Sequence, residues 1–233
     1  IQGLQIDGNK ATYTASYNNG IYLSSSSNNT VTGNICNNNG YYGIYLSSSS
    51  NNTVTDNICS NNNNHGIRLD SSNNNTITGN TYNNNSDGIY LDSSNNNTVT
   101  DNTCNDNSNG IRLYSSSSNA VTGNTCNNNS VGIYLYSFHN NNNTVTGNTC
   151  NNNNSYGISL SSSSNNTVTG NTCNNSNRGI YLSSSSNNTI TGNTCNDSNN
   201  GIYLTSSNNN TITGNTCIRG TGQTSDYTSS QYT

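Results

Sequence analysis

A column of tyrosine and arginine side chains recurs along this sequence at intervals of 22 to 25 residues. Two residues beyond three of its members lie further side chains able to do chemistry: Asp70, Asp92 and Tyr114. Flat aromatic rings and guanidinium groups stack on sugar rings or pack against a neighbouring molecule. They also stabilise the sheet that carries them. The column consists of Tyr22, Tyr45, Arg68, Tyr90, Arg112, Tyr134, Ser159, Tyr181 and Tyr203.

The charged members of this set form the one candidate active site in the sequence. Arg68, Asp70, Asp92 and Arg112 would share a patch if successive repeats were stacked. Opposite charges on an otherwise uncharged surface are more simply explained as a neutralised face. All nine acidic residues are Asp, and no Asp cluster converges to hold calcium and present a base. We therefore predict no catalytic residue and no enzymatic activity.

The cysteines follow the same period, one per repeat, with Tyr82 where one is missing. Stacked repeats would place them in a buried column of small apolar side chains. Disulfides between repeats or between molecules are the alternative, although parallel side chains give poor disulfide geometry. No CxxC motif occurs, and a one-sided sulfur column cannot surround a metal tetrahedrally. We predict no metal and no cofactor. The column is Cys36, Cys59, Cys104, Cys126, Cys150, Cys173, Cys195 and Cys217.

These columns belong to a segment, GIYLSSSSNNTVTGNTCNNN, that is written about nine times. Its first glycines are Gly20, Gly43, Gly66, Gly88, Gly110, Gly132, Gly157, Gly179 and Gly201. A fixed period in this range is the signature of a solenoid. With 27% hydrophobic and 6% charged residues the composition resembles that of a disordered segment,. The periodicity overrules that interpretation, because the few apolar residues recur at the same place in every repeat.

One repeat, residues 43–61, predicts one rung of a parallel β-helix. Ile44 and Leu46 alternate with polar residues at the strand period of two and would face inward,. Val54 and Cys59 would face inward from a second and a third short strand, and polar bends separate the strands. No 3.6-residue apolar pattern exists, which excludes a helical repeat. We predict an all-β, single-stranded parallel β-helix of about ten rungs of ~22 residues.

The repeat form GIYLSSSSNNTVTGN, as at residues 20–34, resembles the right-handed parallel β-helix (PbH1) repeats of NosD-like and related proteins of archaeal cell surfaces. The resemblance covers residues 3–217. It implies a right-handed coil in a family that includes polysaccharide lyases and hydrolases, a copper-site maturation factor and surface proteins. Copper chemistry is not expected here, because the chain has two His and no Met.

Other columns are explained as structure. Asparagines that open the third strand could form a hydrogen-bonded ladder: Asn34, Asn57, Asn80, Asn102, Asn124, Asn148, Asn171, Asn193 and Asn215,. Outward Thr-x-Thr pairs resemble those of some ice-binding solenoids, although Thr is an ordinary exposed strand residue. Asn-x-Thr sites, such as Asn28, Asn51, Asn96, Asn165 and Asn187, would accept glycans in a secreted chain,.

We divide the chain into a shortened first rung (1–19), the β-helix (20–217) and a polar tail or inter-subunit segment (218–233). The leading interpretation is a self-associating subunit of an extracellular layer, sheath or fibre, joined through rung ends or flat faces. The alternative is a carbohydrate-binding or carbohydrate-processing surface protein, and ice binding is third. Net charge of −4 with five basic residues predicts no nucleic-acid partner,. No segment has the ~20 apolar residues of a membrane span.

Overall fold

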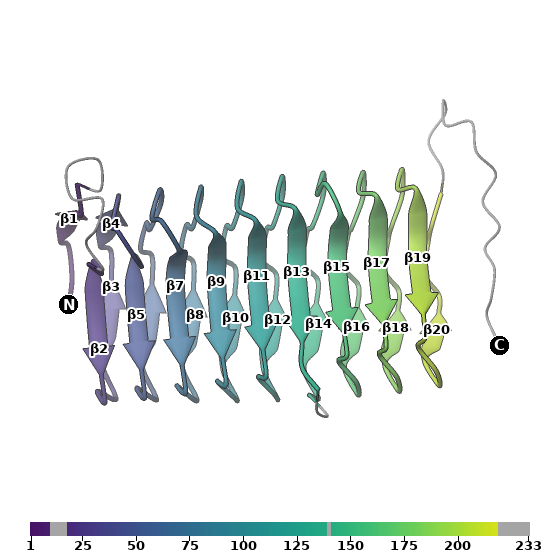
Figure 1. Cartoon of the computed structure of the whole chain (residues 1–233), viewed down its shortest axis with the longest axis horizontal. Coiled ribbons are helices and arrows are strands. Elements are labelled where there is room, and N and C mark those ends of the chain that lie inside the picture. The colour runs from purple at the N-terminus through teal and green to yellow at the C-terminus, as the bar shows by residue number, and fades with distance from the viewer. Residues whose placement is uncertain (10–17, 139–140, 219–233) are drawn as a thin grey trace.

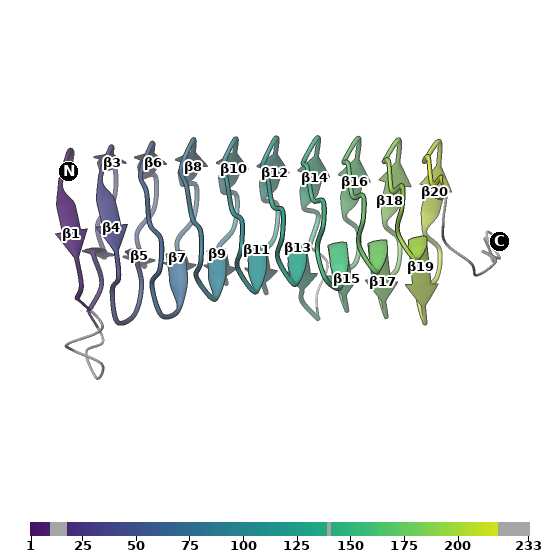
Figure 2. The ribbon, with the colours of Figure 1, turned by 90° about the horizontal axis from the view of Figure 1, so that it is seen from above.

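The computed structural model describes residues 1–9, 18–138 and 141–218. Over these residues the chain is a parallel β-helix, and the rungs stack in register along one axis (Figures 1 and 2). Two nine-stranded parallel sheets form two of its sides, so nine full rungs are present against the predicted ten or so. The predicted architecture is confirmed.

The first sheet carries the Gly-Ile-Tyr-Leu segments. Its strands are β2 (Ile21–Ser24), β5 (Ile44–Ser47), β7 (His65–Asp70), β9 (Asp87–Asp92), β11 (Asn109–Tyr114), β13 (Val131–Tyr136), β15 (Tyr156–Ser161), β17 (Arg178–Ser183) and β19 (Asn200–Thr205).

The second sheet carries the Thr-Val-Thr segments. Its strands are β3 (Thr30–Thr32), β6 (Thr53–Thr55), β8 (Thr76–Thr78), β10 (Thr98–Thr100), β12 (Ala120–Thr122), β14 (Thr144–Thr146), β16 (Thr167–Thr169), β18 (Thr189–Thr191) and β20 (Thr211–Thr213).

The third side is narrower than predicted. Among the residues that the structure describes, only β1 (Gln5–Asp7) and β4 (Ile35–Asn37) form a strand pair there. Further along, the rungs join through single bridges, such as Thr103 to Thr125. Two bends lie close together on this side, so one residue of each rung can pair with the neighbouring rung. A full strand therefore does not form. The Cys residue that follows each bridge still points inward, as expected.

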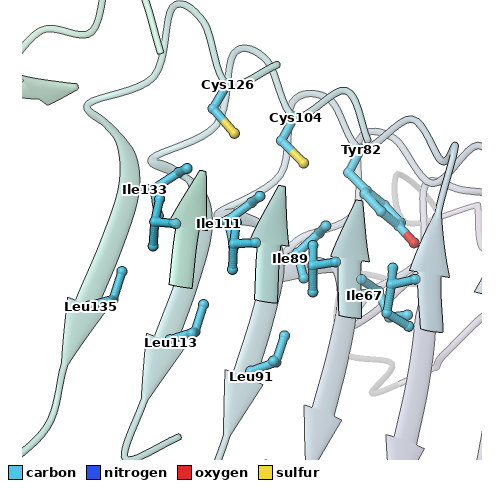
Figure 3. Packing of buried hydrophobic residues seen from close by; sticks show 14 of the residues in the cluster. Ile67, Tyr82, Ile89, Leu91, Cys104, Ile111, Leu113, Cys126, Ile133 and Leu135 are labelled. Atoms are coloured by element: carbon cyan, nitrogen blue, oxygen red, sulfur yellow. The ribbon is translucent and has the colours of Figure 1, made fainter. Parts of the chain in front are cut away.

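Each rung buries the small set of side chains that the alternation predicts. Ile44, Leu46, Val54 and Cys59 have no exposed surface. Equivalent side chains of successive rungs stack into continuous columns, and Tyr82 takes the Cys position of its rung (Figure 3). Stacking lets every rung cover the core of its neighbours, which is how a chain of this composition forms one continuous core.

Asparagine ladders hold the bends. The predicted column is confirmed: Asn102 Oδ1 accepts hydrogen bonds from the backbone N and the side-chain Nδ2 of Asn80, both at 3.0 Å. Asn102 Nδ2 donates to Asn124 Oδ1 and to the carbonyls of Ile77 and Thr100. The Asn102 amide is thereby fully used, which is the condition for burying it,. Two further ladders, which pass through Asn52 and Asn75 and through Asn39 and Asn62, were not predicted.

The glycine that opens each repeat is required by close packing. A Cβ atom on Gly110 would lie 2.6 Å from the carbonyl oxygen of Gly132 and 2.8 Å from Cys126 Cβ. The Cys column therefore lies directly against the glycine column, and no side chain fits between them.

At the N-terminal end, β1 pairs in parallel with β4 and so adds to the third side. The proposed tail lies outside the described residues except for Ile218. Within the described ranges, no helix has the length and apolar character needed to cross a bilayer.

Candidate functional site

The outer face of the first sheet presents three columns of side chains. The sequence pattern predicts the two that contain Arg68 and Asp70. The third consists of the residue before each repeat glycine and includes Tyr42, His65 and Asp87. Because neighbouring strands are in register, members of one column lie ~4.8 Å apart. The face therefore extends roughly 40 Å from β2 to β19.

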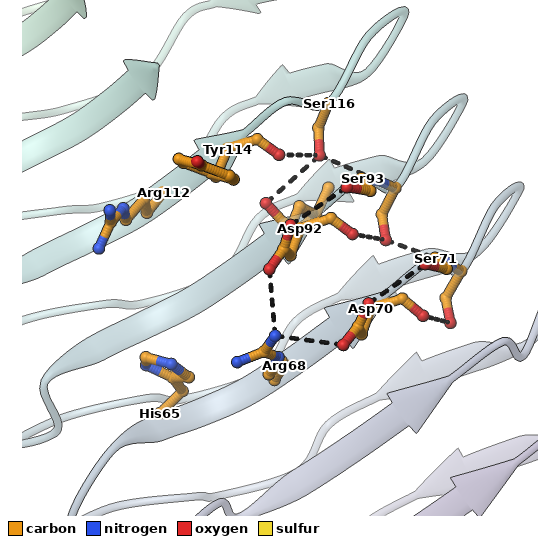
Figure 4. A network of polar contacts seen from close by, with 12 residues as sticks. His65, Arg68, Asp70, Ser71, Asp92, Ser93, Arg112, Tyr114 and Ser116 are labelled. Carbon is orange, nitrogen blue, oxygen red and sulfur yellow. Dashed lines mark hydrogen bonds and ion pairs between the residues drawn. The ribbon is translucent and has the colours of Figure 1, made fainter. Parts of the chain in front are cut away.

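Arg68 lies at the centre of a polar cluster on this face. Its Nη2 atom donates to Asp70 Oδ2 at 3.2 Å and to Asp92 Oδ2 at 3.1 Å (Figure 4). Its Nη1 atom donates to the Tyr42 hydroxyl at 3.1 Å. The guanidinium also lies over the rings of Tyr42, Tyr45 and Tyr90, with centroid distances of 5.2 to 6.0 Å. The structure thus brings Arg68, Asp70 and Asp92 of the predicted patch together, whereas Arg112, its fourth member, lies nearest to the carboxylate of Asp87.

The tyrosines around Arg68 remain protonated. Burial raises the pKa of Tyr42, Tyr45 and Tyr90. These phenols therefore carry no charge at neutral pH. Tyr42 and Tyr90 are buried and support the guanidinium, whereas half-buried Tyr45 can present part of its ring to a ligand. Tyr22 extends the row, since its ring stacks on that of Tyr45 at 4.9 Å. Tyr22 is 53% exposed, which leaves its ring accessible.

A histidine and a buried carboxylate lie beside this cluster. His65 Nδ1 is 3.2 Å from Asp87 Oδ2, and the Asp87 side chain is only 2% exposed. Asn109 Nδ2 donates to Asp87 Oδ1 at 2.6 Å, and Arg112 Nη1 lies 3.9 Å from Asp87 Oδ2. The His65 ring stacks on Tyr42 at 5.1 Å. An imidazole fixed next to a buried carboxylate is suited to move a proton.

The two half-buried carboxylates of the Arg68 cluster are less suited to hydrolysis by a pair of acids. Asp70 and Asp92 both bind the same nitrogen of Arg68, which fills the space between them. A carboxylate pair of a glycosidase needs that space for the sugar or for water. The arrangement therefore favours Asp70 and Asp92 as positioning groups and His65 with Asp87 as the reactive pair.

Further along the face, aromatic side chains continue beyond Arg112. The Arg112 guanidinium lies over Tyr90, Tyr114 and Tyr134 at 5.1 to 6.0 Å. Tyr114 stacks on Tyr136 at 5.4 Å, although Tyr136 is not in the predicted set. Ser159 interrupts the column and is 2% exposed. Beyond it lies a second cluster, formed by Tyr156, Arg178, Tyr181 and Tyr203.

Sequence reasoning missed the column before the glycines. The residues there vary among Asn, Tyr, His, Asp, Val and Arg, so no repeated letter marks the position. Aligning the repeats on their glycines would have identified these residues, because it places them on the same strands as the Tyr and Arg columns. His65 and Asp87, 22 residues apart, are adjacent in this register.

The cysteine column lies inside the coil, away from this face. All eight cysteines are free thiols, and seven of them are buried. Burial raises the pKa of Cys59, Cys126 and Cys150, which keeps them as neutral thiols. The interpretation as small buried apolar side chains therefore agrees with the structure.

We expect native protein to react slowly with iodoacetamide at Cys217, since the Cys195 thiol beside it and partial burial raise the pKa of Cys217, and to leave the other seven thiols unmodified,. Cys217 is exposed, whereas the others are enclosed by neighbouring rungs. Mass spectrometry at pH 8 should show a single added group before denaturation and eight after it. Rapid native modification of Cys126 would contradict the buried column, and Cys217→Ser is the control that should abolish native labelling.

Two family profiles match the chain. That of the family described as "Periplasmic copper-binding protein (NosD)" matches residues 81–233, and that of the "Right handed beta helix region" matches residues 1–143. The chain therefore belongs to the NosD-like, right-handed β-helix repeat proteins. A comparison with curated protein sequences finds no significant match.

Several solved structures share the fold. A periplasmic alginate epimerase is 20% identical with a TM-score of 0.72, and the match covers 93% of this chain and 55% of that one. The A-module of a mannuronan C-5 epimerase from Azotobacter vinelandii is 18% identical with a TM-score of 0.71, covering 93% of this chain and 72% of that one. An exopolygalacturonase from Thermotoga maritima is 12% identical with a TM-score of 0.74, covering 84% and 54%. The chain thus spans about half the length of the first and third.

The prediction that this chain has no enzymatic activity is wrong. The epimerases and the polygalacturonase are enzymes built on the same β-helix. The prediction relied on the columns of Asp70 and Asp92 and overlooked His65 and Asp87 in the third column. At these identities the likeness establishes the fold alone, and an activity of this chain is a matter for proposal.

The family description names copper, and the described residues do not fit a copper centre. No group of three or more His, Cys, Asp or Glu side chains among them is placed to hold a metal ion. The thiols form a single file, and burial holds those of Cys59, Cys126 and Cys150 in the protonated form, whereas the thiolate is the metal ligand,. His65 Nδ1 already faces Asp87.

Proposed function

We propose that this protein binds and processes a polysaccharide on the outer face of its first sheet. The observation that carries the proposal is the Arg68 cluster, in which one guanidinium is held by two carboxylates and a tyrosine hydroxyl among three tyrosine rings. Aromatic faces beside fixed polar groups are what a sugar ring requires, since its two faces are apolar and its edge carries hydroxyls.

The extent of the face supports a polymeric ligand. Aromatic residues of the face occur from Tyr22 on β2 to Tyr203 on β19, both of which are exposed. The spacing of neighbouring strands is close to the length of one sugar unit, so successive rungs can contact successive units of a chain. The similar solved structures include proteins named for alginate, mannuronan and polygalacturonan chemistry, which supports a polysaccharide over other polymers.

The second sheet offers less for such a ligand. Its outward residues are mainly threonines, and the charged and aromatic side chains gather on the first sheet. The interpretation as a subunit of a layer or fibre has no comparable feature in its favour among the described residues. We place the protein outside the cytoplasm, in keeping with the periplasmic description of the NosD family.

Replacing Tyr22 and Tyr45 together by Ser should weaken polysaccharide binding roughly 30-fold or more, because two stacking surfaces are lost,. Serine is the native residue at this register position in β15, at Ser159, so the fold accommodates it. Affinity electrophoresis in gels that contain alginate, polygalacturonate or a neutral polysaccharide measures the effect. The matched control is Thr78→Ser with Thr100→Ser on the second sheet, and equal retardation of both double variants would refute the site.

Replacing His65 by Asn should abolish processing and leave binding within about threefold of wild type, because the imidazole transfers the proton while the rings hold the polymer. Asparagine already occupies this register position at Asn109 and Asn200. Product formation from alginate and polygalacturonate, followed by chromatography of the reaction mixture, is the measurement. Full activity of the His65→Asn variant would show that His65 does not transfer the proton.

A further inference from the structure

Arg178 differs from the other two described arginines of the face. Arg68 binds Asp70 and Asp92, and Arg112 lies near Asp87. Arg178 forms no ion pair with any carboxylate in the described part of the chain. Its one side-chain hydrogen bond runs from Nη1 to the Tyr156 hydroxyl at 3.4 Å. Its buried Nε atom has no hydrogen-bond partner, a property that it shares with Arg68 and Arg112, so the absence of a carboxylate is what sets Arg178 apart. The second cluster therefore carries a positive charge that its surroundings do not neutralise.

The surroundings of Arg178 fix the guanidinium without satisfying it. The group lies 4.6 Å from the ring centroid of Tyr181, 4.3 Å from that of Tyr203 and 5.6 Å from that of Tyr156. Tyr156 and Tyr181 stack on each other at 4.7 Å. Stacked rings hold the planar group in place and shield part of it from water, which strengthens its attraction for an anion.

The neighbouring positions leave room for an anionic ligand. In the register column of Arg178, the residues on the two neighbouring strands are Tyr156 and Asn200, which are neutral. A guanidinium presents parallel N–H groups that match a carboxylate. The Arg178 cluster therefore lacks a carboxylate of the kind that binds the guanidinium in the Arg68 cluster.

We propose that Arg178, with Tyr156, Tyr181 and Tyr203, binds the carboxylate of a uronic acid unit in the polysaccharide. This inference rests on the proposed function and narrows the substrate class to acidic polysaccharides. Arg178 on β17 and Arg68 on β7 are five strand spacings apart, roughly 24 Å. A polymer that reaches both clusters has several sugar units. The carboxylate of one unit binds Arg178 on β17, while another unit of the same polymer lies at His65 on β7.

The test compares polygalacturonate and alginate oligosaccharides with their methyl esters, which keep the sugar and remove the charge. We expect wild-type protein to bind one acidic oligosaccharide at least tenfold more tightly than its ester in isothermal titration at low salt. Arg178→Asn should lower that affinity to the level of the ester and leave ester binding unchanged. Asn is native at this register position in β19, and Arg178→Lys, which keeps the charge, should retain part of the preference.

The outcomes separate this inference from the proposed function. Equal binding of acid and ester, or an acid preference that survives in Arg178→Asn, overturns the assignment of Arg178 and leaves polysaccharide binding standing. Tighter binding of a sulfated polysaccharide than of either uronate overturns the choice of a carboxylate. Failure to bind any acidic, esterified or neutral polysaccharide overturns both.

Discussion

Replacing Asn124 by Asp is expected to destabilise the protein by about 3–5 kcal/mol at pH 7, because it places an unpaired charge in the core. Asn124 is fully buried, and its Nδ2 donates to the carbonyls of Val99 and Thr122 and to Asn148 Oδ1. A carboxylate offers these three oxygens no hydrogen. Urea unfolding of the variant and of wild type measures the difference.

The destabilisation caused by Asn124→Asp should become smaller as the pH falls. One carboxylate oxygen could still accept from Asn102, but burial and the acceptor oxygens around the other would raise the pKa of the introduced carboxyl in the folded state above its unfolded value of about 3.9,. Between those two values the folded state binds more protons, so its stability increases as pH decreases. Asn74→Asp is the matched control, since Asn74 is exposed at a bend with a φ of 56° that Asp also adopts. If the difference in unfolding free energy between wild type and Asn124→Asp stayed constant from pH 7 to pH 4, it would contradict the buried ladder.

Raising the pH above 9 is expected to unfold the protein cooperatively. Burial raises the pKa of Cys59, Cys126, Cys150 and Tyr82 well above their ordinary values, whereas in the unfolded chain the thiols ionise near pH 9.0. Above that pH the unfolded state binds fewer protons, so the free energy of unfolding falls as pH rises. Each fully buried thiol contributes about 1.4 kcal/mol per pH unit. Several together exceed the ~5–15 kcal/mol stability of an ordinary domain within about two units.

Urea midpoints measured from pH 8 to pH 11 test this dependence. The control variant Cys126→Ala should have a slope that is smaller by about 1.4 kcal/mol per pH unit, because one thiol is removed. It should also be somewhat less stable at pH 8, since a cavity replaces the sulfur. A stability that does not change between pH 8 and pH 11 would show that the thiols ionise inside the folded coil.

The fold was largely predictable because one pattern is repeated nine times. The alternation at Ile44 and Leu46 and the recurrence of Val54 and Cys59 place the same side chains inside every rung. Asparagine has two roles in each rung: it adopts the left-handed backbone conformation at bends, and its side-chain amide forms hydrogen-bonded ladders between rungs. One Asn column could therefore be predicted. The other ladders were missed because runs such as residues 61–64 do not show which Asn points inward. The third side was overestimated because its strand is too short for more than one bridge.

The site was predictable only in part because function lies where the repeats differ. Arg68, Asp70 and Asp92 replace common repeat residues and were identified, and the structure joins them through one guanidinium. His65 and Asp87 come from a position where every rung differs, so their pairing at 3.2 Å depends on the register between strands. The same holds for Arg178 and Tyr156. Repetition specifies the fold, and departures from it specify the site.

The central claim is that a polysaccharide lies along the outer face of the first sheet. A crystal structure of the protein with a bound uronate oligosaccharide tests it directly. We predict sugar rings against Tyr22 and Tyr45 and a carboxylate at Arg178, with the second sheet free of ligand. An oligosaccharide bound along the Thr-x-Thr face of the second sheet, or at the ends of the coil, would contradict the account.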